Sequence, residues 1–138
     1  MSTPTPSQTV GPFFGVGLGR VDAGGSIRVE GQVLDGEGEP VPDALVEVAH
    51  GEEFGRVRTD DEGAFALMVS PTSFLLVTVF ARGLLRHLNT RMYFPGVEDE
   101  VLGSVDPARR HTLIARRDGD VLRFDIRLQG SDETVFFE

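Results

Sequence analysis

Besides its 22 acidic residues, this sequence has three histidines and one tyrosine that could bind a metal ion or transfer a proton. Histidine binds zinc or iron, often together with carboxylates, when several such groups surround one point. His50 ends a predicted strand, and His87 lies on the polar face of another. His111 follows two arginines. Because no two histidines have the spacing of partners in a site, we predict surface or hydrogen-bonded structural roles for them and no metal site.

A glycine-rich run at residues 15–19 is the other pattern that could carry chemistry, since such runs can bind phosphate groups. No predicted strand precedes it and no clear helix follows, so it predicts a loop. The sequence has no nucleophile elbow. It also has no cysteine, which excludes disulfides, thiolate metal sites and a cysteine nucleophile. We therefore assign no catalytic residue to this chain.

Length and composition limit the fold. A chain of 138 residues suits one domain with one hydrophobic core. Its 8 prolines and 17 glycines separate short apolar runs, which predicts an all-β sandwich or barrel with little helix. The formal charge of -9 argues against a nucleic-acid partner. No apolar stretch approaches the roughly 18–20 residues of a membrane span. Residues 1–6 lack the segments of a signal peptide, so we expect a cytoplasmic protein.

The centre of the predicted sandwich is a hairpin. Residues 73–83 form a nearly unbroken apolar, β-branched run, which predicts a central strand buried on both faces. From His87 to Phe94, polar and apolar side chains alternate before a Pro-Gly turn, which predicts a half-buried neighbouring strand.

The remaining segments are divided between an arm and a domain. Residues 1–25 contain prolines, glycines and a cluster of aromatic residues, which predicts an extended arm docked on the core or on a partner. Residues 26–138 form the predicted sandwich domain. Its further elements are a strand from Ile27 to the turn at 35–40, a strand at 44–49, a hairpin of 56–59 with 64–69, a helical turn within 97–103, strands at 110–115 and 121–129, and a short edge strand at 133–138. The last segment could instead be buried against a partner subunit.

Several motifs resemble one family of enzymes. Two motifs of the hairpin are similar to a block of the intradiol ring-cleavage dioxygenases. They are Phe-Ala-Arg-Gly at 80–83 and His-Leu-x-Thr-Arg-x-Tyr-Phe at 87–94. The arm, Thr-Pro-Ser-Gln-Thr-Val-Gly-Pro-Phe at 5–13, and the ending at 124–137 resemble the same family. The segment 31–44 is less specific, because it also resembles transthyretin-like and carboxypeptidase-regulatory-like sandwiches. The resemblance implies a single-domain antiparallel β-sandwich.

The resemblance also implies where iron would be. Family members cleave a catechol ring with a ferric ion held by two tyrosines and two histidines. Tyr93 is the single tyrosine here, and the positions that correspond to the histidines are Phe74 and Leu76. In the two-chain members that act on protocatechuate, the iron lies in the β chain, and the homologous α chain has lost its ligands. The resemblance therefore implies an iron-free α chain, with ferric iron in a partner β chain, in an enzyme that converts protocatechuate to 3-carboxy-cis,cis-muconate.

In such a pair, the resemblance places Thr9, Gly11 and Pro12 of the arm, together with Arg82, beside the iron pocket of the β chain. Counting by twos from Leu76 puts Arg82 on the face of the missing ligands. A guanidinium there could bind the carboxylate of protocatechuate, although an ion pair within the chain would also satisfy it. Phe13 stands where the family has a tyrosine, so this chain lacks that hydroxyl.

Two alternatives stay open at this point. The chain could be a free-standing transthyretin-like binding module that shares only the sandwich. It could also be an iron enzyme with an unusual ligand set, which the single tyrosine disfavours. The chain is shorter than the α chains it resembles, with predicted deletions after Gly24 and in the two loops, near 50–54 and 69–73, that carry ligand tyrosines in iron-binding relatives.

Overall fold

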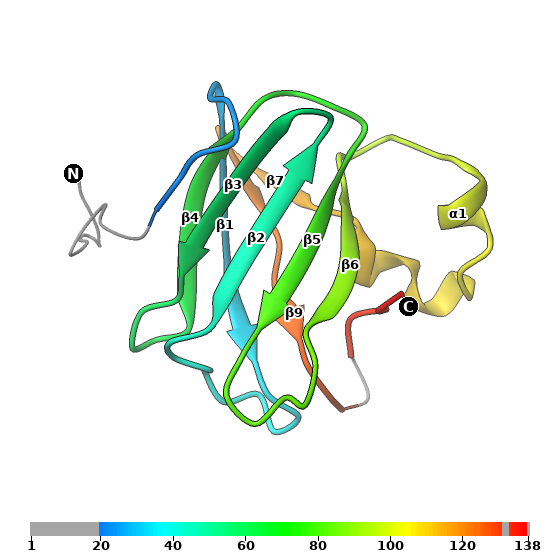
Figure 1. Cartoon of the computed structure of the whole chain (residues 1–138). Coiled ribbons are helices and arrows are strands. Elements are labelled where there is room, and N and C mark those ends of the chain that lie inside the picture. Colours follow the sequence, from blue (N-terminus) through cyan, green and yellow to red (C-terminus); the bar gives the residue numbers. More distant parts are fainter. Residues whose placement is uncertain (1–19, 131–132, 138) are drawn as a thin grey trace.

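A computed structural model describes residues 20–130 and 133–137 of the chain. These residues form two packed β-sheets with little helix (Figure 1), which confirms the all-β sandwich. The strands and helices are β1 (Ile27–Leu34), β2 (Leu45–His50), β3 (Glu53–Arg58), β4 (Ala64–Val69), β5 (Phe74–Phe80), β6 (Leu88–Tyr93), α1 (Glu100–Gly103), the 3-10 helix η1 (Pro107–Leu113), β7 (Arg116–Asp118), β8 (Val121–Arg123) and β9 (Ile126–Arg127).

The two sheets differ in strand direction. Within the described residues, β3, β2, β5 and β6 form an antiparallel sheet in that order. The other sheet has the order β4, β1, β8, β7, with β9 also paired to β1. Its β1–β8 and β1–β9 pairs are parallel, so the sandwich is mixed rather than purely antiparallel. Parallel strands need a long connection, and the chain between β1 and β8 provides one because it includes the whole other sheet, α1 and η1.

The predicted hairpin of residues 73–94 is present as β5 and β6, and β5 lies between β2 and β6. The prediction that β5 is buried on both faces is wrong for this chain. Leu75, Val77 and Val79 are buried in the core between the sheets, whereas Leu76 on the outer face is 51% exposed. Among the described residues, only the inner face of this sheet packs against the other sheet. In Figure 1 the outer face of the sheet points toward the viewer.

Two other strand predictions are wrong. The segments 56–59 and 64–69 do not form a hairpin, because β3 pairs with β2 and β4 pairs with β1. The turn at 60–63 carries the chain from one sheet to the other. Residues 110–115 were predicted as a strand but mostly belong to η1. Asp106 caps that helix through the N–H of Ala108, and Pro107 occupies its first turn, where a missing N–H costs nothing.

The predicted strand at 121–129 is interrupted, and β8 and β9 are its two parts. β1 comes so close at Gly31 that a Cβ atom there would lie 1.8 Å from the carbonyl oxygen of Phe124. At this point the carboxylate of Asp125 accepts the backbone N–H of Gln32 at 3.0 Å. The Asp125 carboxylate therefore accepts a backbone N–H that would otherwise donate to a neighbouring strand.

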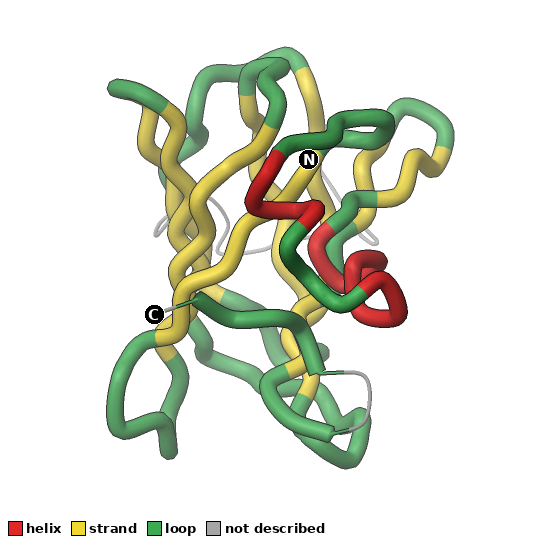
Figure 2. The backbone as a smooth tube through the Cα atoms, turned by 90° about the vertical axis from the view of Figure 1, so that its right-hand side faces the viewer, coloured by secondary structure: helices red, strands yellow, loops and turns green. Residues whose placement is uncertain are grey.

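A second hydrophobic cluster covers one end of the outer face. Tyr93, Leu102 and Leu113 are its buried members and come from β6, α1 and η1. The C-terminal segment contributes Phe137, which forms a single bridge with Asn89 of β6 instead of the predicted edge strand. Figure 2 shows the helices and this segment on the same side of the molecule.

The predicted arm of residues 1–25 can be followed only in its last part. Val21 bridges Arg56 of β3, and Ala23 bridges Val69 of β4, so this part links the edges of the two sheets. The candidate residues Thr9, Gly11 and Pro12 lie outside the described residues, as does Phe13. The boundary of the arm at residue 25 therefore stays a prediction. No helix within 20–130 and 133–137 has the length and apolar character to cross a membrane; the cytoplasmic location also stays a prediction.

Candidate functional site

The positions at which the resemblance places iron-binding histidines lie on the outer face of β5. Phe74 and Leu76 point the same way because side chains alternate along a strand. The guanidinium carbon of Arg91, on neighbouring β6, lies 4.3 Å from the centroid of the Phe74 ring. Leu76 is paired with Arg91 across the two strands. An aromatic ring and an alkyl chain beside a fixed cation offer no electron pair to a metal, so these residues do not fit a ferric ion.

Tyr93 is the other residue that could have been an iron ligand, and it is fully buried. Its hydroxyl donates to the carboxylate of Asp99 at 2.9 Å and accepts from Nη1 of Arg91 at 3.1 Å. Burial raises the pKa of Tyr93 above its ordinary value of 10.0, against the opposing effect of Arg91. The phenol is therefore neutral at physiological pH and has both of its hydrogen-bonding functions satisfied. This arrangement suits a structural tyrosine and not a tyrosinate ligand.

Asp99 connects this tyrosine to the start of α1. Its Oδ1 atom accepts the backbone N–H of Leu102 at 2.8 Å, so the side chain caps the helix. This N–H lowers the pKa of Asp99, and the Tyr93 hydroxyl and Arg91 act in the same direction. We call Arg91, Tyr93 and Asp99 the buried triad after its buried tyrosine; the side chains of Arg91 and Asp99 are 24% and 33% exposed. The buried triad fastens α1 to the hairpin beside Phe74, one of the two positions that correspond to iron-binding histidines.

The three histidines lie in different parts of the fold. His50, at the end of β2, is within 2.9 Å of the Thr72 hydroxyl. The ring of His87 lies 5.4 Å from that of Phe80. His111 belongs to η1. In the part of the chain that the structure describes, no three His, Cys, Asp or Glu side chains come together in a group that could hold a metal ion.

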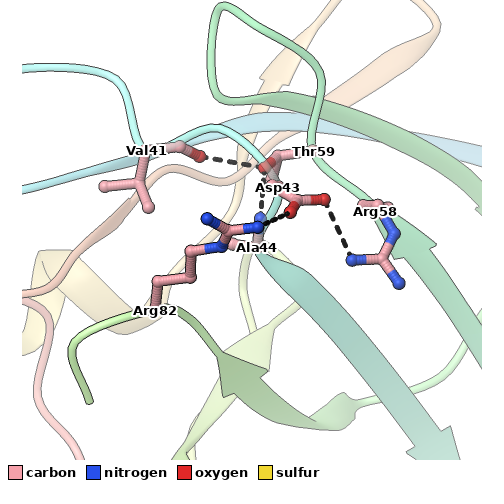
Figure 3. A network of polar contacts seen from close by, with 6 residues as sticks. All are labelled: Val41, Asp43, Ala44, Arg58, Thr59 and Arg82. Carbon is pink, nitrogen blue, oxygen red and sulfur yellow. Dashed lines mark hydrogen bonds and ion pairs between the residues drawn. The ribbon is translucent and has the colours of Figure 1, made fainter.

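Arg82, the one candidate site residue that the structure describes, lies in the turn between β5 and β6. Its side chain is 88% exposed, and Nη2 is 3.4 Å from Oδ2 of Asp43 (Figure 3). The strand ends at Phe80, so the alternation used to place Arg82 on the face of the missing ligands does not extend to it. The structure thus contains the ion pair within the chain that was the other expectation for this arginine.

Asp43 also pairs with a second arginine. Arg58, at the end of β3, donates from Nη1 to Oδ1 of Asp43 at 3.0 Å. We call Arg58, Asp43 and Arg82 the exposed triad. Asp43 has a φ of 62°, in the left-handed region that aspartate tolerates better than most residues.

The backbone around Asp43 is fixed from beneath. Thr59 is buried, its Oγ1 accepts the N–H of Ala44 at 2.8 Å, and its hydroxyl donates to the carbonyl of Val41 at 2.9 Å. These bonds hold the 41–44 turn so that the Asp43 carboxylate lies between the two guanidiniums (Figure 3).

Sequence reasoning missed Asp43. It belongs to the Pro-Val-Pro-Asp-Ala segment at 40–44, which was interpreted only as a feature of the fold. The signal that could have singled it out is an aspartate in a proline-rich turn directly before a strand. Its partner Arg82 is 39 positions away, however, and nothing in the local sequence indicates that pairing.

Comparison with known proteins decides the family. No model of a known protein family matches the chain. The protocatechuate 3,4-dioxygenase alpha chain of Burkholderia cepacia is 33% identical over 192 aligned positions, which include 97% of this chain and 96% of the relative. The alpha chain of the same name from Pseudomonas putida is 36% identical over 195 positions, with the same two coverages.

The chain belongs to the family of protocatechuate 3,4-dioxygenase alpha chains. This confirms the resemblance to intradiol ring-cleaving dioxygenases and makes this alpha chain a member of a family of oxidoreductase subunits. The aligned positions outnumber the 138 residues of the chain, so the relatives have segments without a counterpart here. This agrees with the predicted shortening.

A solved structure supports the fold. The dioxygenase domain of a dioxygenase carbohydrate-binding protein fusion from Streptomyces sp. SirexAA-E superposes with a TM-score of 0.59 at 23% identity, covering 79% of this chain and 83% of that chain. At this identity the likeness concerns the sandwich itself.

Proposed function

We propose that this alpha chain is the iron-free subunit of a protocatechuate 3,4-dioxygenase, an enzyme that cleaves protocatechuate with dioxygen to 3-carboxy-cis,cis-muconate. The iron would be held by a homologous β chain. The observation that carries the proposal is the near full-length similarity to chains of that name. It is supported by the hydrocarbon side chains of Phe74 and Leu76 and by the engagement of the Tyr93 hydroxyl in the buried triad.

In this proposal the alpha chain contributes to the substrate pocket across the subunit interface. Thr9, Gly11 and Pro12 would lie beside the iron pocket of the β chain, on the strength of the arm motif. Arg82 would bind the carboxylate of protocatechuate. The high exposure of Arg82 favours such a role, because ion pairs at the surface contribute little and exchange partners readily. Its planar guanidinium can pair with a carboxylate through two hydrogen bonds.

Co-expression with the β chain of a protocatechuate 3,4-dioxygenase tests the proposal. We expect the two chains to co-elute, the complex to absorb in the visible range as ferric tyrosinates do, and the complex to turn over protocatechuate. The alpha chain alone should be colourless and inactive. A colourless chain that ignores the β chain would instead favour the transthyretin-like binding module. Iron binding and ring cleavage by the isolated chain would contradict the assignment of iron to the partner.

A substitution in the active complex tests the role of Arg82. Arg82→Gln should raise the KM for protocatechuate by roughly tenfold, because a charged hydrogen bond to the substrate carboxylate is lost. Catechol lacks that carboxylate, so its turnover should not change. Arg86→Gln is the matched control, since Arg86 is also exposed in the loop between β5 and β6. An unchanged KM for protocatechuate would remove carboxylate binding from the role of Arg82.

A further inference from the structure

A cleft of about 280 Å³ lies between η1, the strands β7 to β9 and the C-terminal segment, and none of the residues that line it belongs to either triad. Residues from all of these elements line it: His111, Thr112, Ile114, Arg116, Arg123, Phe124, Asp125, Arg127 and Thr134. The N–H of Val135 donates to the Thr112 hydroxyl at 3.2 Å, which holds the C-terminal segment against η1 at the rim. The cleft is therefore made by parts of the chain that tertiary structure brings together.

The charge of this cleft is opposite to that of the whole chain. The chain has 22 acidic and 13 basic residues. Among the residues that line the cleft, three arginines from three different strands face one carboxylate, that of Asp125. Guanidinium groups in a partly enclosed space attract anions more strongly than isolated surface arginines do, because water screens them less.

Asp125 cannot neutralise all three arginines. Its Oδ1 atom accepts from Arg123 at 3.1 Å and from the backbone N–H of Gln32 at 3.0 Å. Its Oδ2 atom is 3.8 Å from Arg116, beyond hydrogen-bonding distance, and the Arg116 side chain is 73% exposed. Within the described ranges, no acidic side chain forms an ion pair with Arg127. Among the residues that the structure describes, neither Arg116 nor Arg127 thus has a carboxylate within hydrogen-bonding distance.

Two hydroxyl groups of the cleft already have partners. The Thr134 hydroxyl accepts the N–H of Arg127 at 2.9 Å, and the Thr112 hydroxyl donates to the carbonyl of Arg109 at 2.8 Å. Most of the remaining donors belong to the arginines, since a guanidinium has five N–H groups, whereas His111 contributes one imidazole. Guanidinium groups on separate strands match a ligand with separate carboxylates, since each fork pairs with one carboxylate.

We propose that this cleft binds a small organic anion with two or more carboxylates, through Arg116 and Arg127, with Asp125 holding Arg123 in place. The volume of the cleft suits a molecule somewhat smaller than a typical drug-sized ligand. The site does not depend on the proposed enzymatic function, because none of its residues belongs to the face of β5 or to the turn of Arg82.

Isothermal titration of the full chain with citrate, in buffer of about physiological ionic strength, tests this proposal. We expect saturable binding at one site, weakened roughly tenfold by Arg127→Gln and by Arg116→Gln. Arg56→Gln removes the same charge from β3 in the other sheet and should leave the affinity unchanged. Circular dichroism melts check that each variant folds, and Arg116→Gln decides the result if the half-buried Arg127 proves necessary for folding.

Two further probes separate specific binding from general attraction. Citrate should bind at least roughly tenfold more tightly than inorganic phosphate or benzoate, because only citrate can pair with both free guanidiniums. Equal affinity for citrate and phosphate would overturn the assignment to polycarboxylates. A titration without saturation, or equal weakening by Arg56→Gln and Arg127→Gln, would overturn the site itself.

Discussion

The two ends of β5 carry two triads of similar composition in opposite surroundings. The buried triad lies beside Phe74, where Tyr93 joins Arg91 to Asp99. The exposed triad lies beyond Phe80, where Arg58 and Arg82 share Asp43. Both contain an aspartate and an arginine from the hairpin. They differ in burial, because the first is centred on the fully buried Tyr93, whereas the Arg82 side chain is 88% exposed. A desolvated polar group must keep its partners, whereas an exposed one can exchange them with water or a ligand.

This difference gives the two regions different roles. The buried triad is a structural connection between the hairpin and α1, and it leaves no free ligand atom on Tyr93. The exposed triad has Arg82 at the surface beside Asp43, whose turn is held by Thr59.

Removing the Tyr93 side chain should destabilise the protein most. Tyr93→Ala should lower the free energy of unfolding by about 3–5 kcal/mol, because it empties the centre of the second cluster. Tyr93→Phe keeps the ring and should cost about 1–3 kcal/mol, since Asp99 and Arg91 lose their shared partner. Urea denaturation measures both. If Tyr93→Phe costs as little as an exposed substitution, the hydrogen bonds of the buried triad contribute nothing to stability.

The backbone conformation of Asp43 should contribute more to the stability of the protein than its charge. Asp43→Ala should cost about 1–2 kcal/mol, because alanine tolerates the left-handed region poorly. Asp43→Asn should be close to neutral, since asparagine favours that region and loses only surface ion pairs. The two variants are compared by thermal and urea denaturation. A similar loss in both would mean that the ion pairs, and not the backbone, make this residue important.

A matched pair of arginine substitutions compares the triads directly. Arg91→Gln should cost more than about 1 kcal/mol, because Arg91 donates to a buried hydroxyl and lies over the Phe74 ring. Arg82→Gln should change the free energy of unfolding by less than about 0.5 kcal/mol. Both substitutions remove one positive charge, so net charge cannot explain a difference. Equal losses would refute the distinction between the two regions.

Acid should weaken the buried triad when the Asp99 carboxylate becomes protonated. The pKa of Asp99 is lowered from 3.8, chiefly by the N–H of Leu102, so the unfolded chain binds the proton first. The contribution of the Asp99 carboxylate to the free energy of unfolding is therefore present above about pH 4 and is lost as the pH falls through the lowered pKa. Asp99→Asn should flatten this part of the plot of unfolding free energy against pH. Asp61→Asn, in an exposed turn, is the control and should leave the curve unchanged.

The local pattern of apolar and polar residues was sufficient to predict much of the fold. The strand Ala64–Val69 was predicted with its observed bounds, because apolar side chains alternate between two clear turn signals. The hairpin of β5 and β6 was predicted from its apolar run and the alternation that follows. The helical turn within 97–103 was predicted from its acidic residues and the proline after it, and α1 lies there. The strand predicted at 110–115 failed because alternation in so short a segment is weak, and the cap at Asp106 favours a helix.

The candidate site, like the fold, could be predicted from local sequence only in part. Composition and motifs by themselves determined the all-β class, the family and the hydrocarbons at positions 74 and 76. Only the tertiary structure decided that β5 exposes its outer face, that Tyr93 is enclosed by α1, and that Asp43 holds Arg82. The reason is that burial and ion pairing depend on segments distant in sequence, and a strand pattern does not specify which face another layer covers.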